Sequence, residues 1–243
     1  MELEELRFAA REIVEDPRLT YHQRRARLAG LAEDSLEYPA VSAACAEALD
    51  KRIICDMYEG AAPYRPRYLL PDYARALTYG STFLQLPAPT TLADALWFLA
   101  AMYTQVPSIT GYPVYLGNLD RDLAPFTEGM TEDELVDALR PFWRALDRML
   151  PDAFVHLNLG PDNSPFVRAV FRLERELQQV VPNLTLQVDP ERTPDELLLE
   201  GVKTVFACGK PHFVNHPMMV GDHGERYAAV SCYNSLKIGG GAH

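Results

Sequence analysis

The sequence lacks the long apolar runs and the basic excess that mark several large classes of protein. No stretch approaches the roughly 20 uninterrupted apolar residues that a membrane helix needs, which argues against a membrane protein. The N-terminus, MELEELRFAAREIVED, has no basic end followed by an apolar run, so we expect no secretory signal and a cytoplasmic location. The net charge of −11 repels phosphate backbones, so nucleic acid is not an expected partner.

Closely spaced cysteine pairs are also missing. The four cysteines lie far apart, and none forms a CxxC pair: Cys45, Cys55, Cys208 and Cys232. A cytoplasmic chain of 243 residues does not need disulfides, so each cysteine needs its own explanation. With 48% hydrophobic and 23% charged residues, the composition is that of a globular protein with a substantial core.

The first part of the chain reads mainly as helices. Composition predicts helices over 2–15 and 20–33, and a further helix from Thr91, buried nearly all round with its aromatic residues in the core. Segment 59–90, rich in proline and tyrosine, is expected to be an irregular connection. Two later helices have clear starts, a capping box at Thr131–Glu134 and the pair Ser164–Pro165. Pro141 should kink or divide the first of these two helices.

The chain then changes character and predicts an α/β unit. Residues 183–188 alternate apolar and polar side chains like a half-buried strand. Thr193–Glu196 is expected to form a second capping box, which opens a helix to about Cys208. A second strand is expected from Tyr227. Strand, helix, loop and strand in succession favour an α/β arrangement.

Cysteine and histidine gather toward the end of the sequence and raise the question of a metal site. Five such residues fall within 25 positions: Cys208, His212, His216, His223 and Cys232. Cys and His are zinc ligands, but this spacing matches no familiar finger or knuckle. Pro211 and Pro217 bracket the first two histidines and argue against a helix that would hold both. A metal-dependent enzyme is therefore the third-ranked hypothesis, and no metal ligand is assigned.

Cys232 has only neutral neighbours along the sequence, VS before it and YN after it. A nucleophilic cysteine needs a nearby cation or helix N-terminus to hold the thiolate, and no local feature supplies one. Two alternatives stay open, an inert core cysteine and homolytic chemistry that breaks the S–H bond without ionisation. The local pattern alone favours the inert cysteine.

A resemblance to a known superfamily reverses that preference. The segment from Pro182 to Asn215 resembles the stretch that leads to the radical cysteine in glycyl radical enzymes. Its pieces occur in the order found there, a P-x-L-T strand, a T-P-D-E helix start, a G-x-P turn and an asparagine-bearing loop, followed by the cysteine. More closely, the chain resembles the YjjI family of glycyl radical proteins. The similar segments are Ile53–Arg75, Pro113–Asp120, Leu150–Pro165 and Val230–Leu236.

This resemblance implies a fold, a chemistry and partners. The fold class is α/β, with an N-terminal helical region packed on part of an α/β barrel that is built from two half-barrels. The implied catalytic residue is Cys232, as a thiyl radical that abstracts hydrogen from a small-molecule substrate. Asn215, Asn234 and His212 are the candidate substrate-binding residues. The implied partner is a radical-SAM activating enzyme, the implied conditions are anaerobic, and a homodimer is one further arrangement considered.

Two departures from the family pattern limit what the resemblance implies. The R-V-x-G segment that stores the radical is not found, and Gly239–Gly241 do not match it. We therefore expect a truncated, single incomplete domain over 1–243, mainly helical over 1–180 and α/β over 181–243, inactive alone. No cofactor is expected in this chain, and the protein-derived glycyl radical is expected only in a complete enzyme. A separate C-terminal chain with the glycyl radical domain is a further expected partner.

The second departure concerns the residue two positions after the cysteine. Asn234 stands where the diol-dehydratase and decarboxylase branches carry a glutamate, and no adjacent cysteine pair is present. Those named reactions are therefore not transferred. The alternative to an enzyme is a non-catalytic truncated remnant or binding module. If a half-barrel is missing, apolar strand edges should be exposed.

Overall fold

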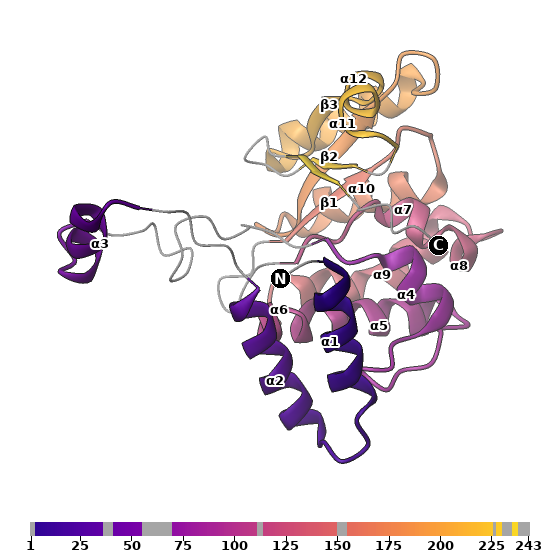
Figure 1. Cartoon of the computed structure of the whole chain (residues 1–243). Helices are drawn as coiled ribbons and strands as arrows, with labels where there is room; N and C mark the ends of the chain where they lie inside the picture. Colours follow the sequence, from indigo (N-terminus) through magenta and orange to yellow (C-terminus); the bar gives the residue numbers. More distant parts are fainter. Residues whose placement is uncertain are drawn as a thin grey trace. The chain divides into compact units, whose positions relative to one another are not determined.

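A computed structural model describes residues 3–35, 41–54, 70–110, 114–149, 155–225, 227–229 and 235–237. The chain divides into two compact units, one of residues 1–69 with 105–112 and the other of residues 70–104 with 113–243. Each unit is described by itself, and Figure 1 shows their elements. The expected single domain over 1–243 stays a prediction.

The first unit contains four of the described helices. They are α1 (Leu3–Glu15), α2 (Tyr21–Asp34), α3 (Ala43–Asp50) and α6 (Pro107–Thr110). The helices predicted over 2–15 and 20–33 are therefore confirmed as α1 and α2. α2 packs against both α1 and α6. The turn between α1 and α2 is closed by Arg24, whose guanidinium donates to the Asp16 carbonyl oxygen at 2.9 Å.

Among the described elements, the second unit holds most of the helices and all of the strands. Its helices are α4 (Tyr73–Tyr79), α5 (Leu92–Gln105), α7 (Leu119–Asp122), α8 (Ala124–Thr127), α9 (Glu132–Leu146), α10 (Pro165–Leu177), α11 (Asp195–Cys208) and α12 (His216–His223). α4 corrects the expectation that segment 59–90 is irregular throughout, because it occupies part of that segment. Asp72 explains its start, since the carboxylate caps the helix by accepting from the Arg75 N–H at 3.2 Å.

Two helices begin where the sequence predicts. Thr131 and Glu134 form a complete capping box at the start of α9, and the Ser164 side chain caps α10 by accepting from the Val167 N–H. α9 runs through Pro141 as one helix, so the proline does not divide it. The alternative, a kink at Pro141, stays a prediction. The buried face of α9 packs against α10, and tertiary packing of this kind offsets the cost of an internal proline.

The strands form a small parallel sheet in the order β1 (His156–Leu159), β2 (Asn183–Val188) and β3 (His212–Asn215). Leu157 lies opposite Leu184, and Leu186 lies opposite Phe213. α10 connects β1 to β2, and α11 connects β2 to β3. The α/β class is confirmed at this level, and the strand predicted over 183–188 is β2.

α11 approaches the sheet closely at Gly201. A Cβ atom at this position would lie 3.2 Å from the Phe213 ring and 3.4 Å from the Leu186 side chain. The absence of a side chain at Gly201 therefore lets α11 pack on the leucine-bearing face of the sheet. α10 packs beside α11, and α9 packs beside α10 (Figure 1). One face of the sheet is thus the apolar core of this unit.

Two predictions about helices are wrong. α11 begins after Pro194 with no side-chain cap, because the Thr193 hydroxyl is used elsewhere. It donates to the Pro161 carbonyl oxygen at 2.8 Å and accepts from the Asp189 N–H at 2.9 Å. α5 is not buried all round, since Trp97 is 66% exposed on the same side as Asp94.

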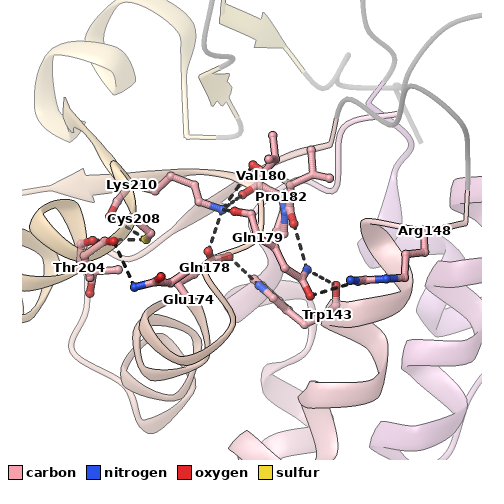
Figure 2. Close-up of polar contacts among 12 residues, drawn as sticks. Trp143, Arg148, Glu174, Gln178, Gln179, Val180, Pro182, Thr204, Cys208 and Lys210 are labelled. Atoms are coloured by element: carbon pink, nitrogen blue, oxygen red, sulfur yellow. Dashed lines mark hydrogen bonds and ion pairs between the residues drawn. The ribbon is translucent and has the colours of Figure 1, made fainter.

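A buried ion pair fixes the N-terminal ends of β2 and β3 (Figure 2). Lys210, which directly precedes β3 across one proline, places its Nζ 2.7 Å from Glu174 Oε2 on α10, and both side chains are almost completely buried. The Trp143 indole N–H donates to the other Glu174 oxygen at 2.6 Å. Lys210 Nζ also donates to the carbonyl oxygens of Gln179 and Pro182 at 2.9 and 2.8 Å. One ammonium group therefore joins α10, the start of β2 and the start of β3.

Candidate functional site

The face of the sheet opposite the leucines is polar and buried. His156 and Asn158 alternate with leucines along β1, and Thr185 and Gln187 alternate with leucines along β2. All four side chains are buried. Alternation places these four residues on one face, because successive strand side chains point to opposite sides. Buried polar groups need hydrogen-bond partners, so something must cover this face.

An extended segment widens this polar face beside β1. The Leu116 N–H donates to the His156 carbonyl oxygen at 2.9 Å, and the Asn158 N–H donates to the Gly117 carbonyl oxygen at 2.8 Å. Asn118 then forms an isolated parallel bridge with Asn158. Asn118 is thereby placed at the same level of the sheet as Asn158 on β1.

The cover is strand β4 (Tyr227–Ala229), which pairs antiparallel with β5 (Ser235–Lys237). The Tyr115 hydroxyl donates to the Ala229 carbonyl oxygen at 3.1 Å, and the Thr185 hydroxyl reaches the same oxygen at 3.5 Å. The Asn118 amide donates to the Tyr227 carbonyl oxygen at 3.5 Å. The backbone of β4 is therefore held by side chains of the sheet rather than by a ladder with β1 to β3.

Asn158 makes the most complete contact with β4. The Asn158 amide takes the orientation that satisfies both of its polar atoms. Its nitrogen donates to the Tyr115 hydroxyl and to the Ala229 carbonyl oxygen, the latter at 3.3 Å, and its oxygen accepts from the Ala229 N–H at 3.3 Å. A side-chain amide has one donor group and one acceptor oxygen, so it can pair with the N–H and the carbonyl oxygen of one residue as a neighbouring strand would. Asn158 is thus the principal side-chain anchor of Ala229.

A second polar pair lies at the other end of β4. The His216 Nδ1 atom and the Tyr227 hydroxyl oxygen are 2.9 Å apart. Burial lowers the pKa of His216 and raises the pKa of Tyr227, so the neutral hydroxyl donates and the neutral imidazole accepts. Gln187, which is fully buried, donates to the Asn118 amide oxygen at 2.9 Å and thereby links β2 to Asn118.

The face beneath β4 holds its titratable groups in their neutral forms. Burial lowers the pKa of His156 to about 4, with a smaller contribution from His212. Burial likewise raises the pKa of Tyr115 well above its ordinary value. The side chains that bond to β4 therefore carry no formal charge at neutral pH. These side chains themselves offer no cation for a thiolate, and the positive charges that act on His216 come from Arg121 and Arg192 outside them.

Asp120 lies just beyond this face, on α7. Its Oδ2 atom accepts from the Gly160 N–H at 3.0 Å, and its Oδ1 atom is buried with no hydrogen-bond partner among the described residues. Removal from water raises the pKa of this carboxyl to about 6, and the Gly160 N–H and the Arg121 charge oppose the shift without cancelling it.

This shift gives a prediction for stability against pH. An acid whose folded pKa exceeds its unfolded value binds more protons in the fold, so its contribution to stability is lost as pH rises from about 4 through 6. Asp120→Asn removes that loss. We expect the stability of the variant relative to wild type to rise by about 2 kcal/mol between pH 4 and pH 7, measured by urea unfolding.

Asp94→Asn is the control, because it should show the opposite sign. The Thr91 side chain lowers the pKa of Asp94 by hydrogen bonding, so this group stabilises the fold at higher pH and loses that contribution as pH falls. A difference between Asp120→Asn and wild type that stays constant from pH 4 to pH 7 would contradict the assignment.

Only two of the four residues predicted for the site, His212 and Asn215, lie in the described part of the chain. Cys232 and Asn234 lie outside the described residues. Asn215 is exposed and caps α12, since its side-chain oxygen accepts from the Met218 N–H at 3.1 Å. His212 is exposed at the start of β3. Their predicted roles in substrate binding stay predictions.

The histidines of the third-ranked metal hypothesis do not form a single cluster. His212 lies on β3, whereas His216 and His223 lie at opposite ends of α12. No group of three or more His, Cys, Asp or Glu residues in the described part of the chain could hold a metal ion. No single helix carries both His212 and His216, as the flanking prolines predicted.

The polar face was missed by sequence reasoning, although a signal for it exists. Along 156–159 and 183–188, polar residues occupy every second position. Such alternation usually indicates a face open to water. Only the hydrogen bonds to β4 show that this face is covered.

The fold and the covered polar face define an α/β protein whose parallel sheet is covered on its polar face by strand β4, which pairs with β5. The family model described as "Glycyl radical enzyme YjjI-like" matches residues 19–243. The chain therefore belongs to the YjjI-like glycyl radical enzyme family. Among the described residues, no helix is long and apolar enough to cross a membrane.

Two relatives are similar to this chain over most of its length. The chain is 51% identical over 232 residues to the uncharacterized protein YjjI of Escherichia coli (strain K12), a match that covers 95% of this chain and 45% of that protein. It is 38% identical over 228 residues to an uncharacterized protein of Haemophilus influenzae (strain ATCC 51907 / DSM 11121 / KW20 / Rd), with coverages of 93% and 44%. The chain thus spans less than half the length of these relatives.

Proposed function

We propose that this chain supplies the thiyl part of a glycyl radical enzyme. A glycyl radical, held on a polypeptide that completes the enzyme, takes the hydrogen atom of the Cys232 S–H group. The resulting thiyl radical then removes a hydrogen atom from a C–H bond of a small-molecule substrate. Each step breaks one bond to hydrogen and forms another, so no proton or electron leaves the site.

The observation that carries this proposal is the anchoring of the hairpin by the polar face. β4 ends at Ala229 and β5 begins at Ser235, and these two residues are paired. Cys232 is three positions from each of them in the sequence, so its Cα lies within about 11 Å of both by the reach of an extended chain. Holding Ala229 therefore restricts where the sulfur can lie. Positioning of this kind supplies much of the rate in hydrogen transfer between two groups in contact.

The charge state of the face also favours this chemistry. Burial keeps the side chains of Tyr115 and His156 on this face neutral, so neither supplies a counter-charge for a thiolate. Hydrogen-atom abstraction needs the neutral thiol. The complete enzyme is expected to enclose this face in an α/β barrel, which excludes water and oxygen, and to work in the cytoplasm under anaerobic conditions with a radical-SAM activating enzyme.

Radical installation tests the proposal. The chain is combined anaerobically with the part of the Escherichia coli relative that it does not match and with the activating enzyme. We expect an organic radical signal in electron paramagnetic resonance, split by the remaining glycine α-hydrogen, from the combined polypeptides. Either polypeptide alone should give less than a tenth of that signal. A complex that assembles but never acquires the radical would show instead that the chain is a non-catalytic remnant.

A further inference from the structure

Charged side chains gather in the segments at the carboxyl ends of the parallel strands. Asp162 follows β1 and Arg192 follows β2, and the Arg192 guanidinium donates to the Asp162 carboxylate at 3.0 Å. His216 directly follows β3, and Arg121 lies on α7, just after the residue Asn118 that bridges to β1. Ligands of open α/β sheets bind outside this end of the strands. Groups at this end that have no partner are therefore candidate ligand contacts.

Arg121 is a half-buried cation without an acidic partner. No ion pair or side-chain hydrogen bond of its guanidinium is found among the described residues. Burial dominates the pKa shifts of three groups near it, and the Arg121 charge acts on all three by lowering the pKa: Asp120, His216 and Tyr227. Asp120 accepts from the Gly160 N–H instead of pairing with Arg121. A half-buried guanidinium without its own counter-charge is suited to bind an anion.

His216 adds a second hydrogen-bond donor. Its side chain is almost completely buried, and its Nδ1 atom accepts from the Tyr227 hydroxyl at 2.9 Å. In a neutral imidazole one ring nitrogen accepts and the other carries the proton, so the Nε2 atom of His216 is an N–H donor. In the part of the chain that the structure describes, this N–H has no hydrogen-bond partner. It therefore favours a ligand atom that accepts a hydrogen bond.

The charges around His216 indicate the charge of that ligand. After burial, the positive charges of Arg121 and Arg192 have the largest effects on the pKa of His216. The acids Asp189 and Glu225 act in the opposite direction and more weakly. Arg192 is already neutralised by its ion pair, so Arg121 supplies the unpaired positive charge. A carboxylate carries one negative charge at neutral pH, whereas a phosphate group carries nearly two, so this balance favours a carboxylate.

We propose that the Arg121 guanidinium and the His216 Nε2–H group bind a carboxylate of the substrate. The guanidinium donates to both carboxylate oxygens, and the imidazole donates to one of them. The site lies beside Tyr227 on β4, five positions before Cys232 in the sequence. The substrate class is therefore a small organic acid. Its assignment as the substrate rests on the proposed function, whereas the binding of a carboxylate at this site does not.

Binding to the chain without any radical chemistry tests this site. Acetate is the probe, and acetamide, which has nearly the same shape without the charge, is the control ligand. Titration followed by nuclear magnetic resonance of the histidine rings should show saturable binding of acetate. Acetate should also raise the pKa of His216, because an anion at Nε2 stabilises the protonated ring. Acetamide should leave this pKa unchanged, which separates a direct contact from a general effect of the titrant.

Variants assign the binding to Arg121. Arg121→Gln should weaken acetate binding by about 10- to 100-fold, the effect of losing hydrogen bonds to a charged group. Arg121→Lys keeps the charge but not the paired donors, so its affinity should be intermediate. Asp120→Asn should bind acetate more tightly, because it removes a negative charge on which Arg121 acts. Arg144→Gln is the matched control, since Arg144 is exposed on α9, and it should change the affinity by less than about twofold.

Three results would overturn the site or its ligand class. They are equal acetate binding by Arg121→Gln and wild type, equal binding of acetamide and acetate, and tighter binding of inorganic phosphate than of acetate. Each would leave the proposed function standing, because radical installation is measured separately. Acetate binding by a chain that never supports the radical would keep the carboxylate site and overturn its assignment to the substrate.

Discussion

Replacing Lys210 with methionine should cost about 3–5 kcal/mol of unfolding free energy, the largest stability effect expected for a single substitution in this chain. The Glu174 carboxylate has 0% of its side chain exposed, and Lys210 Nζ is its only positively charged partner within the described residues. Burial already raises the pKa of Glu174, and the Lys210 charge opposes that rise. Without the ammonium group, the carboxylate must stay buried and unpaired or take up a proton.

Urea unfolding at pH 7 measures this loss of unfolding free energy, and its dependence on pH identifies the cause. Loss of Lys210 raises the folded pKa of Glu174 further, so the destabilisation should shrink as pH falls and the carboxyl becomes protonated. The double variant Glu174→Gln with Lys210→Met should recover part of the loss, because it leaves no bare charge. Lys203→Met is the control, since the Lys203–Glu200 pair is more than half exposed on the lysine side and should contribute below about 1 kcal/mol. A loss of less than 1 kcal/mol for Lys210→Met would contradict this view of the pair.

Local sequence rules predicted the elements whose causes are local. The Thr131–Glu134 capping box and the Ser164–Pro165 start both use residues within three positions of the helix that they open. Thr193 shows where this reasoning ends. The same sequence pattern occurs there, but the hydroxyl donates to Pro161, 32 positions away, and α11 starts without it.

Burial was harder to predict than secondary structure. Alternation correctly predicted β2, yet it could not distinguish a polar face open to water from one that is covered by a hairpin. β1 has only four residues, too few for their alternation to predict a strand without the pairing to β2. Trp97 is exposed despite its size, and single exposed apolar residues are common because polar surface cannot cover a whole protein.

For the candidate site, too, the sequence predicted one part and could not predict another. The resemblance singled out Cys232 by its place after an ordered set of motifs, but it gave no account of what holds the cysteine segment. That account comes from Asn158, Thr185 and Asn118, which bond to a strand at least 40 positions further along the chain. Such contacts depend on the folded topology and carry no signal within a local window of sequence.

Replacing Cys232 with alanine should abolish hydrogen transfer between sulfur and glycine, the largest functional effect that we expect. This transfer can be followed without a substrate, because the thiol hydrogen exchanges with solvent and the glycine C–H does not. In D2O, the glycyl radical takes deuterium from the S–D group and leaves a thiyl radical. When the thiyl radical takes back the hydrogen instead of the deuterium, the radical carbon keeps deuterium.

Electron paramagnetic resonance of the reconstituted, activated complex in D2O is therefore the most direct measurement. The account predicts that the doublet collapses in the wild-type complex as deuterium replaces the α-hydrogen, and that it persists in the Cys232→Ala complex at equal radical content. Cys208→Ala should behave like wild type, because Cys208 lies at the end of α11, where its thiol donates to the Thr204 carbonyl oxygen. Collapse of the doublet at the wild-type rate in the Cys232→Ala complex would contradict the account.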